Sequence, residues 1–224
     1  MMKQILMKPF LIFLLLIFCL ETSAQRLSKF ESSQVINSDR IPYTSQPGFY
    51  GCIADTIFLD SNNISSTVFY FYLPDSAIEI GVRAISPVPD ITSPRPGDNT
   101  DSSYYECATT NKGYFDPAII LQKGYLKTSK LPSNIFEWIT IAQNDDSKDL
   151  PAQPNLLLRN ALLRKQPNAK KKNSKLSPGY YRVVLTNNKS HYLIGTFLLQ
   201  IGIVEKNKRL KLYNSIEDLE KSLK

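Results

Sequence analysis

Few residues of this chain have the types and spacing that catalysis needs. Its 224 residues include a single histidine, His191. Metalloproteases, Ser-His-Asp hydrolases and Cys-His hydrolases all require an imidazole held next to a second reactive group. His191 follows Asn187–Ser190, a stretch typical of a turn, which predicts an exposed hairpin residue. We therefore expect a protein that is not an enzyme.

Two acidic neighbourhoods offer the oxygen ligands that calcium prefers. Asp98–Asp101 lies near Glu106, and Asp145 and Asp146 follow a predicted strand. Neither group has the spacing of an EF-hand, and Lys148 would repel a cation from the second. No cofactor is therefore expected, with calcium as the one alternative.

The positive charge of the chain is concentrated in residues 151–176, called the basic segment below. The formal net charge is +7, of which residues 1–24 contribute one. The basic segment carries seven bases and no acid, so the remainder of the chain has a net charge of −1. This pattern predicts a docking site for a polyanion, and the alternative is a solvated loop whose lysines aid solubility. The seven bases are Arg159, Arg164, Lys165, Lys170, Lys171, Lys172 and Lys175.

Residues 1–24 have the three regions of a secretory signal peptide. Two lysines precede an apolar run from Phe10 to Leu20, and small residues end at Ala24. The run is shorter than the roughly 20 apolar residues that span a membrane, and no later segment supplies them. We therefore expect export, with cleavage after Ala24 or, as the alternative, lipidation at Cys19. This compartment also argues against nucleic acid as a partner.

Cys52 and Cys107 remain once the leader is removed. An even pair in an exported chain predicts a disulfide, which is worth about 2–4 kcal/mol when it closes a long loop. Two buried free thiols are the alternative. A metal pair is disfavoured because one histidine and no further cysteine remain to complete a site.

The mature chain is predicted to fold as one domain, residues 49–224, preceded by an extended polar arm, residues 25–48. Ser215 and Asp218 have the spacing of an N-cap and a first-turn acid, which predicts a short C-terminal helix. Asn155–Gln166 fits either a helix or a strand.

Most of the domain is typical of short strands. Thr67–Leu73 is β-branched and aromatic, which predicts a strand buried on both faces. Ala77–Ser86 alternates, with Glu79 and Arg83 on its polar face, and the Pro-rich stretch Pro87–Asp101 predicts a long surface loop. The pattern indicates an all-β fold, an antiparallel two-sheet sandwich of jelly-roll type. The other predicted strands are Tyr104–Thr109, Ile119–Lys123, Ile135–Ala142, Gly179–Thr186 and Gly195–Glu205.

A series of short segments runs through the domain in a fixed order. They are Phe69–Pro74, Glu79–Pro87, Pro96–Asp98, Phe136–Ile139, Gly179–Val183, Gly195–Phe197, Ile201–Gly202 and Ser215–Leu219. In this order they resemble the surface lipoprotein family of leptospiral spirochaetes. The resemblance implies a jelly-roll envelope protein without catalytic activity, associated with host extracellular-matrix components and with calcium. It also favours lipidation at Cys19.

The chain departs from that family pattern where calcium ligands are expected. The family's run of aspartates is missing, and the interval Asn144–Leu176 is short and basic. Glu137 stands in a position where the family has an Asp-Thr pair. The resemblance therefore leaves Glu137, Asp145 and Asp146 as stand-in calcium ligands. Because the cysteine pair is not part of the pattern, we expect a diverged member.

These observations predict a non-catalytic envelope protein, an adhesin that binds extracellular-matrix proteins or sulfated glycans through the basic segment. The alternatives are a structural envelope protein without a specific ligand, or a calcium-dependent protein that binds or acts on glycans. The expected location is the outer membrane and cell surface or the periplasm, with secretion as a further alternative. Trp138 is predicted to pack across strands, whereas Tyr50, Tyr114 and Tyr125 are expected to be exposed for recognition.

Overall fold

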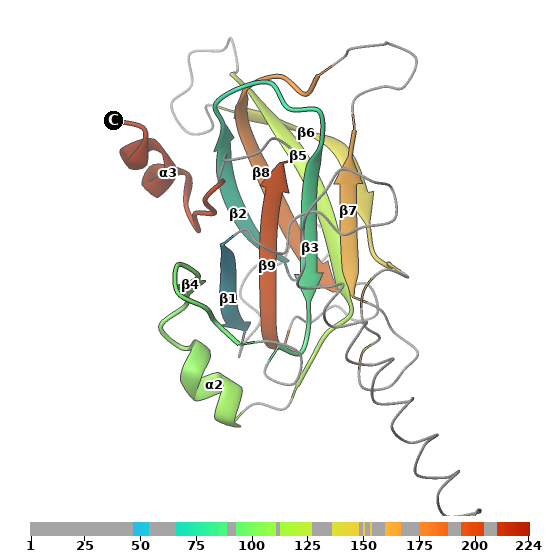
Figure 1. Ribbon diagram of the computed structural model, residues 1–224, viewed down its shortest axis with the longest axis vertical. Helices are drawn as coiled ribbons and strands as arrows, with labels where there is room; N and C mark the ends of the chain where they lie inside the picture. The colour runs from blue at the N-terminus through green and yellow to red at the C-terminus, as the bar shows by residue number, and fades with distance from the viewer. Residues whose placement is uncertain are drawn as a thin grey trace, which may run out of the picture.

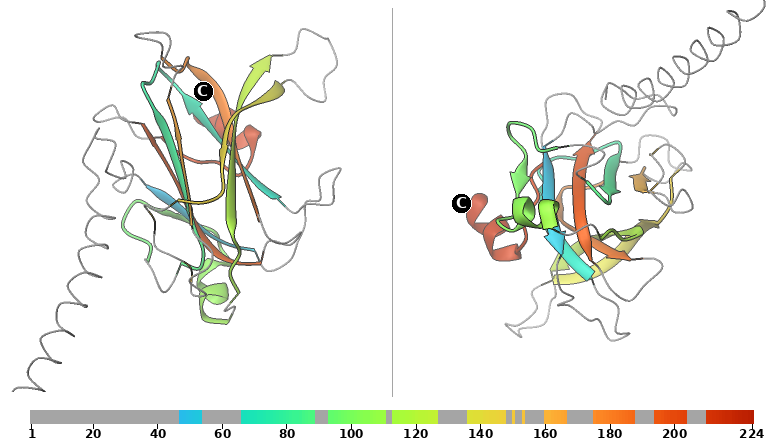
Figure 2. Two further views of the ribbon diagram at one scale, coloured as in Figure 1. Left: turned by 90° about the vertical axis from the view of Figure 1, so that its right-hand side faces the viewer. Right: turned by 90° about the horizontal axis from the view of Figure 1, so that it is seen from below.

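Two β-sheets packed face to face form the body of the molecule in this computed structural model (Figures 1 and 2). The predicted two-sheet, mainly β architecture is thereby confirmed, while the jelly-roll subtype stays a prediction. Cys19, the rest of the leader and His191 lie outside the described residues. The structure describes residues 47–53, 66–88, 93–110, 113–126, 136–147, 150, 153, 160–166, 175–187, 194–203 and 210–224.

One sheet has five strands and the other has four. The five-stranded sheet has the order β4-β1-β9-β3-β7, and the four-stranded sheet has the order β2-β8-β5-β6. All pairs are antiparallel except β1 with the two-residue strand β4, which is parallel. The strands are β1 Gly48–Ile53, β2 Ser66–Leu73, β3 Ile80–Ile85, β4 Asn99–Thr100, β5 Pro117–Leu126, β6 Phe136–Asn144, β7 Ala161–Lys165, β8 Gly179–Asn187 and β9 Gly195–Ile203.

The main core lies between the two sheets. From β2, Phe69, Phe71 and Leu73 point into it, and Phe71 stacks on Tyr181 of β8 with ring centroids 5.3 Å apart. The alternate residues of β2 are only half-buried on the outer face, the face directed away from the other sheet. The prediction of burial on both faces of this strand was therefore wrong, because β2 is an edge strand of an outer layer.

A second, smaller core covers the outer face of the five-stranded sheet. Consequently every residue of β3 and β9 is buried. Glu79 and Arg83 do not face solvent as the alternating pattern predicted; both are buried, and the Arg83 guanidinium donates to the Gln200 side chain across the β3–β9 pair. Ile78, which the alternation of Ala77–Ser86 predicts on the apolar face of the strand, precedes the observed strand and is exposed. The second core consists of Tyr50, Ile85, Val88, Tyr104, Leu150, Leu162 and Leu198.

Helix α2, Tyr104–Thr110, forms where the sequence predicted a strand. Aromatic and β-branched residues favoured the strand, but Tyr104 and Cys107 share one helical face, and these two side chains are buried. Ser103 and Asp101 provide the start, since the Cys107 amide donates to the Ser103 carbonyl and the Tyr104 amide to the Asp101 carbonyl. Packing on the sheet therefore overrides local strand propensity.

The other predicted elements are close to their observed bounds. Strands β5, β6, β8 and β9 cover the segments expected, and α3, Ile216–Ser222, begins after the predicted N-cap, with Ser215 accepting from the Asp218 amide. The ambiguous segment 155–166 contains strand β7, although residues 155–159 are outside the described residues. The predicted loop after Pro87 contains β4. No helix in the described part of the chain is long and apolar enough to cross a membrane.

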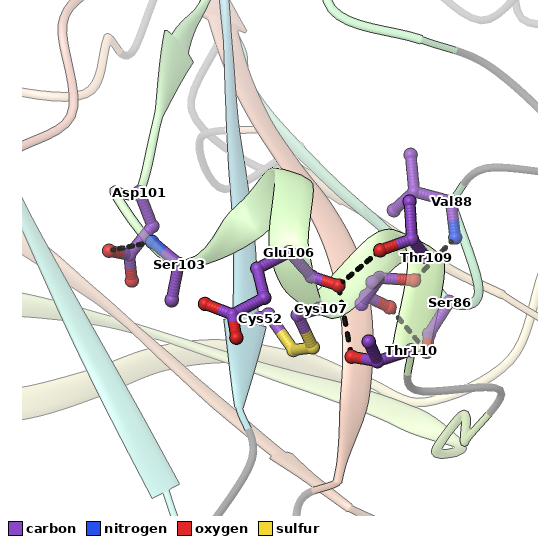
Figure 3. The surroundings of a disulfide bond; sticks show 10 residues. Cys52, Ser86, Val88, Asp101, Ser103, Glu106, Cys107, Thr109 and Thr110 are labelled. Atoms are coloured by element: carbon purple, nitrogen blue, oxygen red, sulfur yellow. Dashed lines mark hydrogen bonds between the residues drawn. A yellow bond between two sulfur atoms is a disulfide. The ribbon is translucent and has the colours of Figure 1, made fainter.

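A disulfide joins α2 to β1, as the cysteine count predicted. Cys52 and Cys107 are 55 residues apart in sequence, and their Cα atoms are 6.1 Å apart. Figure 3 shows the bond between helix α2 and strand β1. The link fixes the helix that covers Tyr50.

We expect the double substitution Cys52→Ala and Cys107→Ala to lower the free energy of unfolding by about 2–4 kcal/mol, because the open chain regains loop entropy. Denaturant titration monitored by circular dichroism measures this loss. Reductant added to the natural protein should shift the midpoint equally, whereas the double variant should not respond to reductant. An unchanged midpoint in both experiments would contradict a stabilising role for the bond.

Candidate functional site

The basic segment contains β7, the edge strand of the five-stranded sheet, and ends three residues before β8 of the four-stranded sheet begins. Arg164 and Lys165 end β7, the edge strand of the five-stranded sheet. Lys175 is exposed and precedes β8. Arg159 and Lys170–Lys172 lie outside the described residues.

Arg164 is engaged inside the molecule. Its Nε is 2.6 Å from Oε1 of Glu79 and its Nη2 is 3.1 Å from Oε2, while Gln166 Nε2 donates to Oε2 at 2.6 Å. The Glu79 side chain is 3% exposed and that of Arg164 is 23% exposed. A buried carboxylate is tolerated when such partners surround it. Arg164 therefore ties β7 to the residue before β3 and is removed from the set of polyanion ligands.

Two contacts hold the ends of residues 167–174 next to each other. Gln166 is bonded to Glu79, and Leu176 forms an antiparallel bridge with Ala77 through hydrogen bonds of 2.7 and 3.0 Å. Because Ala77 and Glu79 are two residues apart, the stretch that carries Lys170–Lys172 leaves and rejoins the described fold at one place. Lys165, opposite Ile80 in β3, and the exposed Lys175 flank that place.

A further lysine lies near the returning end of the segment. The Lys123 amine donates to the Ser177 hydroxyl and lies 5.2 Å from the Tyr125 ring centroid and 5.6 Å from that of Tyr181. Burial lowers the pKa of Lys123 and raises that of Tyr181 to about 12. The Tyr181 hydroxyl donates to the Ser177 carbonyl at 2.6 Å. This arrangement orders residue 177, only two residues after Lys175.

The three tyrosines expected to be exposed differ from one another. Tyr125 is 45% exposed, as predicted, and Tyr114 is half-buried. Tyr50 is only 1% exposed, so that prediction was wrong: its ring contacts Tyr104 and its hydroxyl donates to the Ser93 carbonyl at 3.0 Å. Burial, with smaller contributions from Tyr50 and Tyr105, raises the pKa of Tyr104 to about 12. Tyr50 therefore belongs to the second core.

The predicted calcium ligands lie at opposite ends of one strand. Glu137 is exposed near the start of β6, whereas Asp145 and Asp146 follow its last residue, Asn144. Eight residues of extended chain span about 26 Å, so Glu137 does not share an ion with the two aspartates. Asn144 holds the turn by donating to the carbonyls of Asp146 and Leu162 at 2.9 and 2.7 Å.

The other acidic neighbourhood organises backbone. Asp98 accepts from the amides of Gly48 at 2.6 Å and Arg95 at 2.8 Å, which joins the loop to β1. Asp101 and Glu106 lie on either side of the start of α2 (Figure 3), where the Glu106 carbonyl accepts from two threonine hydroxyls. Within the described ranges, no three His, Cys, Asp or Glu side chains form a group that could hold a metal ion.

The structure contains a buried cluster of polar side chains that the sequence did not predict. The Ser86 hydroxyl donates to the Thr196 carbonyl at 2.8 Å, and the Ser86 amide donates to Asn160 at 2.9 Å. Gln153, fully buried, donates to the Ser86 and Phe115 carbonyls. These bonds satisfy backbone groups where β3 ends, next to the cis Ser86–Pro87 peptide. The cluster joins segments far apart in sequence, so no local motif could have revealed it.

The outer face of the four-stranded sheet carries the second feature missed by the sequence, called the aromatic face below. Its rings are in mutual contact, with centroid distances from 4.7 to 5.7 Å. The Arg182 guanidinium lies 4.7 Å from the Trp138 ring centroid. The prediction that Trp138 packs across strands is confirmed. The aromatic face consists of Tyr70, Tyr72, Phe136, Trp138, Tyr180 and Arg182.

We expect Glu79→Gln to lower the free energy of unfolding by about 1–2 kcal/mol, because the amide cannot balance the Arg164 charge. The value is below that for a fully buried pair because Arg164 is partly exposed. Denaturant titration measures it, and Glu137→Gln, on an exposed side chain, is the matched control with no expected change. Equal stabilities of the two variants would show that the ion pair contributes nothing.

Comparison with known proteins gives a match to a protein family. A model of the Lipl32 family, described as surface lipoproteins of the Spirochaetales order, matches residues 37–211. No curated protein matches the chain significantly. The matched range covers both sheets from β1 to β9 and contains the basic segment and the aromatic face. Since the match extends over more than three quarters of the chain, this protein belongs to the Spirochaetales surface lipoprotein family.

Proposed function

We propose that the protein is a non-catalytic surface adhesin that binds polyanionic host components, such as sulfated glycans of the extracellular matrix, through the basic segment. Membership of a surface lipoprotein family supports export and a surface position. A lipid on Cys19 would hold the protein in the outer membrane, with the folded domain outside.

The observation that supports the proposal is a run of lysines without acids in the sequence, in a segment whose two ends the structure brings together. Lys165 and Lys175 flank the point where residues 167–174 leave and rejoin the described structure, and Lys170–Lys172 lie between them in sequence. The basic segment contains no acid, and Glu79, which lies beside it, is balanced by Arg164. Five lysines within one short stretch of sequence, with no acid among them, favour a local positive potential that would attract a polyanion.

The calcium-dependent alternative has less support. Glu137 is far from Asp145 and Asp146, which leaves a pair of adjacent aspartates instead of a ligand set. A purely structural envelope protein would not need its charge to be concentrated, so this alternative explains the fold but not the distribution of lysines.

The test uses dextran sulfate, a polymer that carries sulfates and no carboxylates. Replacing Lys170, Lys171 and Lys172 by alanine should weaken binding about tenfold near physiological salt, at about 0.5 kcal/mol for each lost exposed charge pair. The salt dependence should also become shallower, because fewer charges are neutralised. Surface plasmon resonance over a salt series measures both quantities.

A second triple variant is the matched control. Lys211, Lys221 and Lys224 lie near the C-terminus and are exposed, so replacing them by alanine changes the net charge equally at another place. This control should bind almost as the natural protein does. Equal losses in both variants would mean that only net charge matters, and no loss in either would contradict the proposal.

A further inference from the structure

The aromatic face is built from three of the four strands of its sheet, β2, β6 and β8. Trp138 of β6 contacts Phe136 of the same strand and Tyr70 of β2, at centroid distances of 5.5 and 5.7 Å. Phe136 contacts Tyr180 of β8 at 4.7 Å, and Tyr180 contacts Tyr72 of β2 at 5.2 Å. All five rings are half-buried. They thus form a continuous layer that remains accessible from outside.

Two features of β5 and β6 put Trp138 in this layer. The β5–β6 register shifts by one residue between Leu121 and Gln122. Ala142 packs against the core, and strict alternation would place Trp138, four residues earlier, on the same inner side. Because of the shift, Trp138 faces outward instead. Gly124 lies opposite Trp138, and a Cβ there would come within 3.0–3.1 Å of the indole ring. Glycine therefore lets the ring lie over the sheet.

Arg182 places a positive charge against the Trp138 ring. Its Nε donates to Gln122 Oε1 at 2.5 Å, and Gln122 donates in turn to the Thr140 hydroxyl at 3.0 Å. Burial lowers the pKa of Arg182, because the surrounding rings displace water from its charge. No carboxylate of the described residues pairs with Arg182. The sheet thus holds an oriented guanidinium that is hydrogen-bonded to the Gln122 and Tyr70 side chains and to no carboxylate of the described residues.

The complementary ligand has flat apolar faces, hydroxyl groups and one carboxylate per repeat. Aromatic rings pack against the C–H faces of sugars, and amide and hydroxyl side chains such as Gln122 and Thr140 can bond sugar hydroxyls. A guanidinium pairs with a carboxylate through two parallel hydrogen bonds. Burial raises the pKa of Tyr180, and the charge of Glu220 in α3 adds to that effect, so this acid lies on the Tyr180 side of the rings. An anionic group would therefore bind on the Arg182 side.

We propose that the aromatic face binds a saccharide chain that contains uronic acid, with its carboxylate on Arg182 and its sugar rings against Trp138, Tyr70 and Phe136. This site shares no residue with the basic segment. It depends on short-range stacking and pairing rather than on charge density. Its success or failure is therefore independent of the function proposed above.

The natural protein reports on this site directly, because Trp138 is the only tryptophan of the chain. Hyaluronan octasaccharide, which carries carboxylates and no sulfates, should change the tryptophan emission in a saturable way. The same oligosaccharide with its carboxyl groups reduced to alcohols should bind about tenfold more weakly, because it lacks the partner of Arg182. No change in emission up to millimolar octasaccharide, with no heat of binding by calorimetry, would overturn the proposal.

Variants separate the ring contact from the charge. By calorimetry, Arg182→Gln should bind hyaluronan about tenfold more weakly and should lose the preference for the carboxylated form. Trp138→Ala should weaken binding of both forms. Ile139→Ala is the matched control, since this exposed neighbour points to the opposite side of β6, and it should bind as the natural protein does.

Two further results make the test specific. The Arg182 variant should keep its affinity for dextran sulfate, and the Lys170–Lys172 variant should keep its affinity for hyaluronan. If Arg182→Gln retains both its unfolding midpoint and full hyaluronan affinity, the arginine has no role and the proposal is wrong. If Arg182→Gln is unfolded, the comparison of natural and carboxyl-reduced ligand on the natural protein decides instead.

Discussion

Burial of both faces of β9 is the constraint on which the rest of the structure depends. Its inner residues, Phe197 and Leu199 among them, fill the main core, while Leu198 belongs to the second core. A strand apolar on both faces needs a layer on each side. The four-stranded sheet covers one side, and α2, fixed by the disulfide, helps to cover the other. On the four-stranded sheet, by contrast, the outward residues of β2 and β8 are only half-buried.

Arginine and lysine have different tasks in this molecule. Arg83, Arg164 and Arg182 each donate to a side chain on a neighbouring strand or segment, namely Gln200, Glu79 and Gln122. A planar guanidinium on a fixed partner loses little conformational freedom when it binds, which suits contact with a single carboxylate. The lysines of the basic segment have flexible stems and compact charges, which suits attraction of a polymer with many charges. The sequence separates these roles only by residue type; the structure assigns each arginine its partner.

The sequence predicts the fold best where one local pattern is sufficient. The alternation in β8 and β9 and the Ser215 cap of α3 are local signals, and they are close to the observed bounds. The errors occur where a tertiary contact decides. Helix α2 forms because Tyr104 and Cys107 pack on the sheet, and Glu79 is buried because Arg164 comes from a strand 85 residues later. No window of ten residues contains either cause.

The candidate sites follow the same rule. A run of bases without an acid is visible in sequence, so the basic segment could be identified, but the internal pairing of Arg164 could not. The aromatic face depends on strand order and on a register shift of one residue, and without that shift Trp138 would point to the other side of β6.

The two proposed sites also act over different distances. Charge attraction from the lysines extends about one Debye length, roughly 8 Å at physiological ionic strength, and weakens as salt rises. Contacts on the aromatic face begin only when a ring or carboxylate touches it, and salt affects the stacking little. A polymer with both kinds of acidic group would therefore first be attracted by the lysines and then be held by Trp138 and Arg182. On that basis the association rate of such a polymer should follow the charge of the basic segment, and its dissociation rate should follow the aromatic face.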